Sequence, residues 1–245
     1  AYATWSQGYR RGGANSLPTT EPPDIQNFVP DKVDNYELGI KGTVNRRLQF
    51  SAAAYYIDWK DVQIATFSPV NFLDAAINGG DASSYGLELE VTASPSDNSV
   101  VSLAYAYTNA KLKEAFSVAN GNFVALDGAR LPGTPEHMFA GAVDITQPLA
   151  AGKLTYHVDA TYTSRTVNEV SLQPLVGEYR EFGGFMTLGA RISFETARWK
   201  FGLFGENLTD SKGVTAQSAL VWIPEQAFEW LQRPRTFGVF ASVEF

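Results

Sequence analysis

The sequence predicts an all-β protein of the transmembrane antiparallel β-barrel class, and three observations lead to this fold class. The first is a strict two-residue alternation at the end of the chain. The second is an alternation of short turns with long connections, which is the arrangement of outer-membrane barrels. The third is the gathering of aromatic residues near strand ends, as in the girdles at the two membrane interfaces. The apolar register of the last strand is Phe237, Val239, Ala241, Val243 and Phe245.

Alternation alone does not separate a membrane barrel from a soluble β-sandwich. In the barrel the apolar register faces lipid and the polar register faces the lumen. In the sandwich the apolar register faces the core and the polar register faces water. The charges placed in strands all fall on one register, which fits a wet lumen but also fits the outer face of a sandwich. The alternation of turns and loops therefore decides in favour of the barrel. The charged positions are Glu37, Lys41, Glu88, Glu90, Asp144, Lys153, Asp159, Arg191, Lys200, Glu206 and Glu244.

The first half of the chain contains five candidate strands. The first carries Tyr2 and Trp5, whose faces the pattern does not assign. The fourth alternates most clearly, because tyrosine, leucine and valine occupy one register while Glu88 and Glu90 occupy the other, so we expect both carboxylates to face a lumen. The five strands span residues 1–8, 34–44, 47–59, 84–92 and 101–108.

The second half contains five more. In the seventh strand, His157 and Asp159 share the polar register, and in the eighth strand Arg191 does, so we expect all three to line the lumen. The eighth and ninth strands are separated by a short turn, and a long loop precedes the last strand. These strands span residues 137–146, 153–163, 186–194, 199–206 and 234–245.

Composition excludes several classes of function. The chain has 245 residues and a net charge of −7, which argues against a nucleic-acid partner. It has no cysteine and only two histidines, so we expect no metal site, and no cofactor. No apolar run approaches the roughly 18 residues of a membrane helix.

Five short motifs carry a family resemblance. They are Tyr2-Ala-Thr-Trp-Ser-Gln-Gly-Tyr-Arg-Arg-Gly-Gly13, Asn35-Tyr-Glu-Leu-Gly-Ile-Lys41, Ala54-Tyr-Tyr-Ile-Asp-Trp-Lys-Asp61, Tyr85-Gly-Leu-Glu-Leu-Glu90 and Asn207-Leu-Thr-Asp210 with the terminal strand. In this order and spacing, the chain closely resembles the C-terminal part of TonB-dependent outer-membrane receptors. Such receptors have about 22 strands around a plugged lumen.

The resemblance implies that residues 1–245 are about ten C-terminal strands of that barrel, with the plug and its energy-coupling box encoded upstream. It also implies the outer membrane of a Gram-negative bacterium, with membrane lipids and lipopolysaccharide around the barrel and TonB reached through the plug. The apolar register that ends at Phe245 resembles the assembly signal that the barrel assembly machinery reads.

The resemblance further implies active transport of a scarce nutrient without chemistry on it. A ferric siderophore is the commonest substrate of the family, while cobalamin, haem and oligosaccharides stay open. Candidate ligand-binding residues in or near the long loops are Arg10, Arg11, Arg165, Trp222 and Arg233.

Two other functions remain as alternatives. One is a small closed outer-membrane barrel that acts as a protease, with His157 and Asp159 as a catalytic pair. The other is a passive porin. In the protease alternative the ten strands close on themselves.

Overall fold

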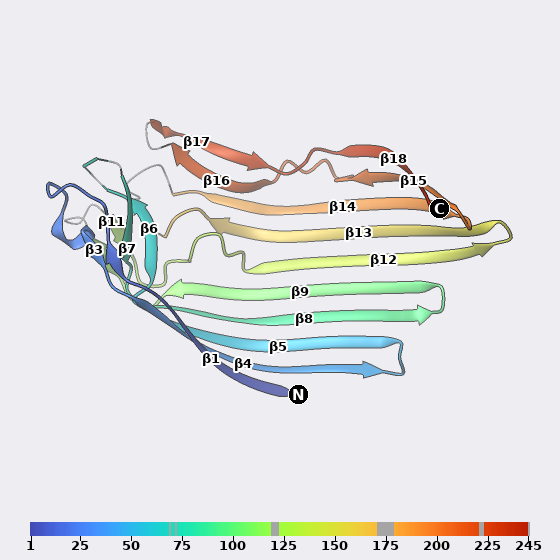
Figure 1. The fold of residues 1–245 in the computed structure, drawn as a ribbon, viewed down its shortest axis with the longest axis horizontal. Coiled ribbons are helices and arrows are strands. Elements are labelled where there is room, and N and C mark those ends of the chain that lie inside the picture. Colours follow the sequence, from blue (N-terminus) through green and yellow to red (C-terminus); the bar gives the residue numbers. More distant parts are fainter. Residues whose placement is uncertain (69, 72, 119–122, 171–178, 221–222, 245) are drawn as a thin grey trace.

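The structure is a computed structural model that describes residues 1–68, 70–71, 73–118, 123–170, 179–220 and 223–244. Its main element is a ten-stranded antiparallel sheet whose strands lie side by side in chain order (Figure 1). All ten predicted strands are confirmed, and β1 and β18 form the two edges of the sheet. The strands are β1 (Tyr2–Arg10), β4 (Asp31–Val44), β5 (Leu48–Lys60), β8 (Ala82–Ser96), β9 (Ser99–Leu112), β12 (His137–Leu149), β13 (Gly152–Val167), β14 (Glu181–Glu195), β15 (Trp199–Glu206) and β18 (Thr236–Val243).

The long connections contain short elements of their own, which the sequence did not predict. In the part of the chain that the structure describes, four of the long connections each contain a two-stranded antiparallel pair, and the connection from β1 to β4 also includes a 3-10 turn. Within the described residues, no helix is long and apolar enough to cross a membrane. The elements are β2 (Gly13–Ala14), η1 (Pro23–Ile25), β3 (Asn27–Phe28), β6 (Gln63–Phe67), β7 (Asp74–Asn78), β10 (Phe116–Val118), β11 (Phe123–Ala125), β16 (Val214–Leu220) and β17 (Ile223–Leu231).

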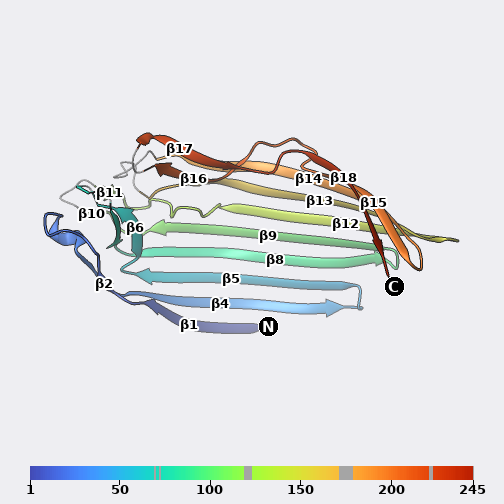
Figure 2. The ribbon, with the colours of Figure 1, turned by 45° about the horizontal axis from the view of Figure 1, so that its top comes forward.

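The connections separate into a turn end and a loop end of the sheet. Figures 1 and 2 show the short turns on the right and the long connections gathered on the left. One of the short turns joins β4 to β5 through Asn45 (φ 50°) and Arg46 (φ 56°). Two consecutive left-handed residues make a type I′ turn, whose twist matches that of the strands it joins. The predicted alternation of turns and loops is therefore confirmed.

The two faces of the sheet differ as the alternation predicts. Large apolar side chains on one face are exposed, including Leu38 (65%) and Val239 (77%). The other face carries the polar register. The strands extend further at the loop end than predicted. In this extension, charged residues take the place of apolar ones on the apolar face. Asp34 pairs with Asp58 there, and Ser83 pairs with Lys111. The expectation that every strand charge lies on one register is therefore wrong at the loop end.

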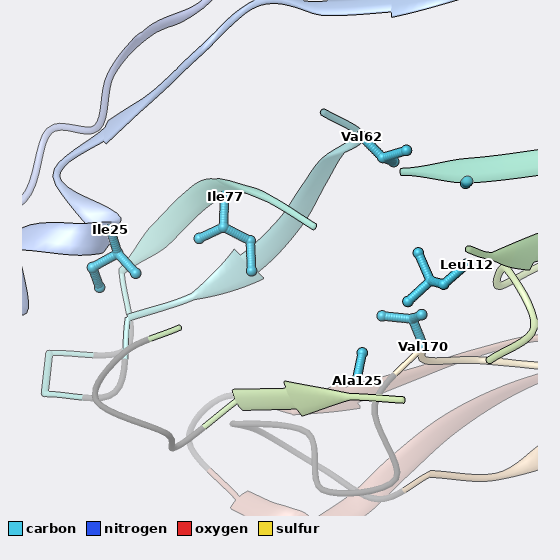
Figure 3. Packing of buried hydrophobic residues seen from close by; sticks show 7 residues of the cluster. Ile25, Val62, Ile77, Leu112, Ala125 and Val170 are labelled. Atoms are coloured by element: carbon cyan, nitrogen blue, oxygen red, sulfur yellow. The ribbon is translucent and has the colours of Figure 1, made fainter. Parts of the chain in front are cut away.

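A buried apolar cluster lies at the loop end, where four connections meet. Ile25, Val62, Ile77, Leu112, Ala125 and Val170 are each at most 3% exposed and belong to one cluster, in which Leu112, Ala125 and Val170 lie close together (Figure 3). We call this cluster the loop core.

Polar side chains tie the connections together around the loop core. The amide group of Asn15 donates to the carbonyls of Ile25 and Ala76 at 2.7 Å each and accepts from the Ala76 amide at 2.9 Å. Glu21 is 3% exposed and accepts from the backbone and side-chain amides of Asn71 at 2.9 and 2.7 Å. The loop end is thus a packed unit in its own right.

We expect Ile77→Ala to loosen the loop end without disturbing the sheet. Ile77 is 1% exposed, and removal of a buried isoleucine costs roughly 2–5 kcal/mol. Hydrogen exchange of the Val62 and Gly79 amides, which bond to the carbonyls of Gly80 and Val62, reports the opening. The matched control is Ile145→Ala on the exposed apolar face, and equal exchange in both variants would contradict a loop core.

Cysteine labelling tests the assignment of the two faces. With the protein in a membrane, we expect Leu89→Cys to resist a water-soluble thiol reagent, because the alternation predicts that position 89 faces lipid. Glu90→Cys, on the opposite face, reacts wherever no other segment covers it. Reaction at position 89 together with protection at position 90 would show that the register is inverted.

Candidate functional site on the polar face and the loop end

Aromatic rings cover glycines on the polar face. A Cβ atom added to Gly39 would lie 2.4 Å from the Tyr2 ring, and one added to Gly86 would lie 2.5 Å from the Tyr55 hydroxyl. The Tyr55 hydroxyl in turn bonds the Thr108 hydroxyl at 2.9 Å. Glycine at these positions lets a ring from the neighbouring strand lie along the wall, which accounts for the glycines of two of the motifs.

Carboxylates dominate the first half of the polar face. Tyr2 donates its hydroxyl to Glu37 at 2.6 Å, and the Lys41 ammonium lies 5.5 Å from the centre of the Tyr2 ring. Glu88 and Glu90 lie on the same face and are exposed, as the sequence predicts. This part of the wall therefore presents negative charge.

His157 lies between two carboxylates on the second half of the polar face. Its Nδ1 is 2.8 Å from Oδ1 of Asp144, and its Nε2 is 3.3 Å from Oδ1 of Asp159. Each ring nitrogen of His157 therefore faces the carboxylate of an aspartate. No ring nitrogen is then left to take a proton from a nucleophile, which disfavours the catalytic pair considered above.

A cavity of about 240 Å³ opens beside this histidine. Its lining includes His157, Asp159, Arg191, Glu206 and Gln232. Arg191 pairs with His157 in the register of β13 and β14 and is exposed on the polar face, as predicted. The mixed charges suit a polar occupant that offers both donors and acceptors.

Arg10 is bound at the loop end by a buried aspartate. Its guanidinium Nε donates to Asp31 at 2.8 Å, its backbone amide donates to the same carboxylate at 3.0 Å, and a second guanidinium contact completes the pair. Asp31 is 1% exposed and also accepts from the Trp59 indole at 2.9 Å. Burial alone would raise the pKa of the Asp31 carboxyl, but the bonds from Arg10, Trp59 and the Gln63 backbone hold it below its ordinary value. Arg10 thus ties the end of β1 to the start of β4 at the loop end.

The other candidate ligand-binding residues are placed differently. Arg11 is exposed beside Arg10. Arg165 and Arg233 are each 73% exposed and lie 3.8 Å from Glu181 and 3.0 Å from Glu206. Trp222 lies outside the described residues, as does Phe245 of the assembly signal. Arg11, Arg165 and Arg233 therefore keep exposed guanidinium groups.

The polar face and the loop end together carry charges of both signs. Among the described residues, no group of three or more His, Cys, Asp or Glu side chains has the geometry to hold a metal ion. What the face offers is a polar wall with charges of both signs below a packed loop end. Such a surface binds other molecules through many modest contacts.

Comparisons with known proteins identify the family. A family model described as "TonB dependent receptor-like, beta-barrel" matches residues 1–208. The chain belongs to the TonB-dependent receptor family. The apolar face of the sheet therefore faces lipid, and the polar face lines the lumen of a barrel of which these ten strands are a part.

Solved structures share the fold of this TonB-dependent receptor chain. The ferric yersiniabactin uptake receptor FyuA from Yersinia pestis matches with a TM-score of 0.76 and 21% identity, over 99% of this chain and 34% of FyuA. BauA, the ferric preacinetobactin receptor from Acinetobacter baumannii, matches with a TM-score of 0.70 and 22% identity, over 99% of this chain and 34% of BauA. The chain thus spans about a third of the length of these receptors. A search among curated proteins finds no match.

Some residues of the site were not singled out in the sequence. Asp31 and Asn15 lie in a stretch rich in glycine and proline, where alternation gives no signal. Only the pairing of β1 with β4 could have indicated the role of Asp31, because this pairing places Asp31 opposite Arg10. An arginine before a long connection and an aspartate after it thus weakly indicate an ion pair across the base of that connection.

The loop end is expected to loosen as the pH rises through neutrality. Burial raises the pKa of Glu169, which lies next to Val170 of the loop core, to about 7. A carboxyl with a raised folded-state pKa stabilises the packing below its unfolded-state pKa, and this contribution is lost as the pH rises through the folded value. Opening at pH 8 should exceed that at pH 5.5 by on the order of tenfold.

Hydrogen exchange at the Gly133 amide, which bonds the Val167 carbonyl at 2.9 Å, measures this opening after correction for intrinsic rates. Glu169→Gln should remove most of the pH dependence. Glu136→Gln, a carboxyl change at the same end, should leave it. An unchanged pH profile in Glu169→Gln would refute the assignment.

Proposed function

We propose that the chain is the C-terminal barrel portion of an outer-membrane receptor that actively imports a ferric siderophore. In this proposal the receptor lies in the outer membrane of a Gram-negative bacterium and is energised by TonB through a plug inside the barrel. The turn end then faces the periplasm and the loop end faces the outside. The substrate is released unchanged.

The observation that carries the proposal is the match of nearly the whole sheet to structures described as a ferric yersiniabactin uptake receptor and a ferric preacinetobactin receptor. Those structures cover 99% of this chain, although at identities of only 21% and 22%. The lumen wall adds a physical argument. It is polar and charged, and it leaves space for an occupant, whereas a small closed barrel of ten strands would be filled by its own side chains.

We assign three exposed arginines to ligand binding, two at the loop end and Arg233 beside Glu206 at the end of β15. Ferric siderophore complexes are often anionic, and guanidinium groups bind such oxygen-rich anions through paired hydrogen bonds. Arg11, Arg165 and Arg233 have the exposure for this role. For Arg10 and Trp222 the ligand-binding role stays a prediction, and the Asp31 contact gives Arg10 a structural task in addition.

The proposed partners follow from the two faces and the edges. Membrane lipids and lipopolysaccharide contact the apolar face, and the plug contacts Glu88, Glu90, His157, Asp159 and Arg191 on the lumen wall. The barrel assembly machinery reads the terminal strand. There Phe237 and Val239 are 70% and 77% exposed on the edge strand β18.

Iron uptake by cells that carry the intact receptor tests the function. Under iron limitation we expect uptake of a ferric siderophore that requires both the receptor and TonB, while binding at the surface persists without TonB. Loss of one charge-assisted contact costs roughly 1.5–3 kcal/mol, so Arg11→Gln and Arg165→Gln should each weaken binding by about tenfold or more.

The matched control is Arg47→Gln at the turn end, where Arg47 bonds Asp97 on the surface at 2.6 Å. This variant should bind and transport normally. Uptake that proceeds without TonB would favour a passive porin. Absence of binding for every ferric siderophore tested, with binding of cobalamin, haem or an oligosaccharide, would replace the proposed substrate.

A further inference from the structure

The polar face of the sheet has a gap over Gly189 in β14. On one side of the gap, the ladder places Asp159 of β13 directly opposite Gly189. On the other side, the last pair of the ladder between β14 and β15 is Ala190 with Gly205. The next residue of β15, Glu206, therefore lies beside Gly189 on the same face. The space between the two carboxylates belongs to the cavity of about 240 Å³ described above.

This arrangement requires a glycine at position 189. A Cβ atom added there would lie 2.8 Å from Oδ2 of Asp159 and nearer still to its Oδ1. The carboxylate of Asp159 thus lies over the glycine. Any larger residue would displace this carboxylate and fill the gap.

Arg191 lies at one end of the gap on the same face. Diagonal neighbours across a ladder are about 7–8 Å apart, and Asp159 and Glu206 are both diagonal neighbours of Arg191. Asp159 instead contacts His157 at 3.3 Å. Glu206 contacts Arg233 at 3.0 Å. Over the described ranges of the chain, no carboxylate lies within ion-pair distance of the Arg191 guanidinium, so opposite charges line one cavity without neutralising each other.

A second polar group in the lining lacks a partner. The side-chain oxygen of Gln232, Oε1, is enclosed, and no donor among the described residues reaches it. An enclosed acceptor without a donor is costly, because it has lost its water and gained no hydrogen bond in return. The cavity therefore presents three acceptor groups to a donor-rich cation and one guanidinium to an anion.

An α-amino-acid group carries both of the missing partners. Its ammonium group has three N–H donors, and its carboxylate suits the fork of a guanidinium. Residues two strands apart have Cα atoms about 9.6 Å apart, which leaves room between their carboxylates for one ammonium group. We propose that this cavity binds the free α-amino-acid group of an imported ferric chelate. Its carboxylate pairs with Arg191, and its ammonium lies between Asp159 and Glu206.

The proposal rests on the transport function proposed above and narrows its substrate. The cavity lies at the end of β15, where Glu206 contacts Arg233, a residue assigned above to ligand binding. It is smaller than the roughly 300–1,000 Å³ of pockets that enclose a whole drug-sized ligand, so it takes one arm of a chelate. Arg191 has five N–H donors, so a contact with the plug leaves donors for the ligand.

Binding of a free amino acid to the purified full-length receptor tests the site. The probes are L-glutamine, N-acetyl-L-glutamine, which lacks the ammonium group, and L-glutamine methyl ester, which lacks the carboxylate. Titration followed by NMR saturation transfer gives the dissociation constants. Because each capped form loses a charge-assisted contact, we expect it to bind about tenfold or more weakly. Arg191→Gln should weaken L-glutamine by a similar factor and leave the methyl ester unchanged.

The matched control is Lys200→Gln, which removes a positive charge from the same face at the turn end and should bind L-glutamine normally. Glu206→Gln is a second variant in case Arg191→Gln does not fold, and it should weaken L-glutamine but not the N-acetyl form. Absence of L-glutamine binding to the wild type, equal affinity for the three probes, or equal loss in Lys200→Gln would each overturn the proposal.

Uptake by cells distinguishes a chelate from a free amino acid as the natural ligand. The probes are a ferric tris-catecholate that carries one free α-amino-acid group and the same chelate with that group N-acetylated and esterified. We expect the free form to be taken up in preference to the capped form and to be inhibited by excess L-glutamine. Equal uptake of the two forms, or no inhibition, would refute a cargo role. Loss of all TonB-dependent uptake with L-glutamine binding intact would contradict the transport function instead.

Discussion

The structure depends on the need of a backbone in hydrocarbon to satisfy every amide and carbonyl group within the protein. The ten-stranded sheet does so through a ladder in which each strand pairs with its neighbour in chain order. The ladder also imposes the alternation of side chains, so one face meets lipid and the other meets the lumen. The exposed Leu38 and the exposed Glu88 are two results of that constraint. Among the described residues, β1 and β18 are the edge strands of this sheet, and each pairs with one neighbour.

Most of the sheet was predictable because alternation is a strong local signal. The strand around Glu88 and Glu90 shows it in the plainest form, and the structure gives both residues the predicted face. The ends of the strands were less predictable. Near Asp34, Asp58 and Lys111 the membrane no longer selects apolar residues, so the pattern fades although the ladder continues.

The loop end was the least predictable part because its contacts join distant segments. Asn15 bonds Ala76, and Arg10 reaches both Asp31 and the backbone of Gln63. Nothing periodic in the sequence announces such pairs, since they depend on how several connections fold over one another. The ligand-binding role of Arg10 was predicted from its charge and its position beside a long loop. Its contact with buried Asp31 could not be predicted in this way, because it depends on the folded structure.

The order of the strands has a consequence for how receptors of this kind can vary. Every strand of the main sheet pairs only with the strands that precede and follow it in chain order. A hairpin is therefore close to a self-contained module: its loss or duplication requires one new pairing where the neighbouring strands meet and leaves the pairings elsewhere in the sheet unaltered. Barrels of different circumference can thus arise by copying paired strands, with the radius set by the number of copies and the surface chemistry inherited.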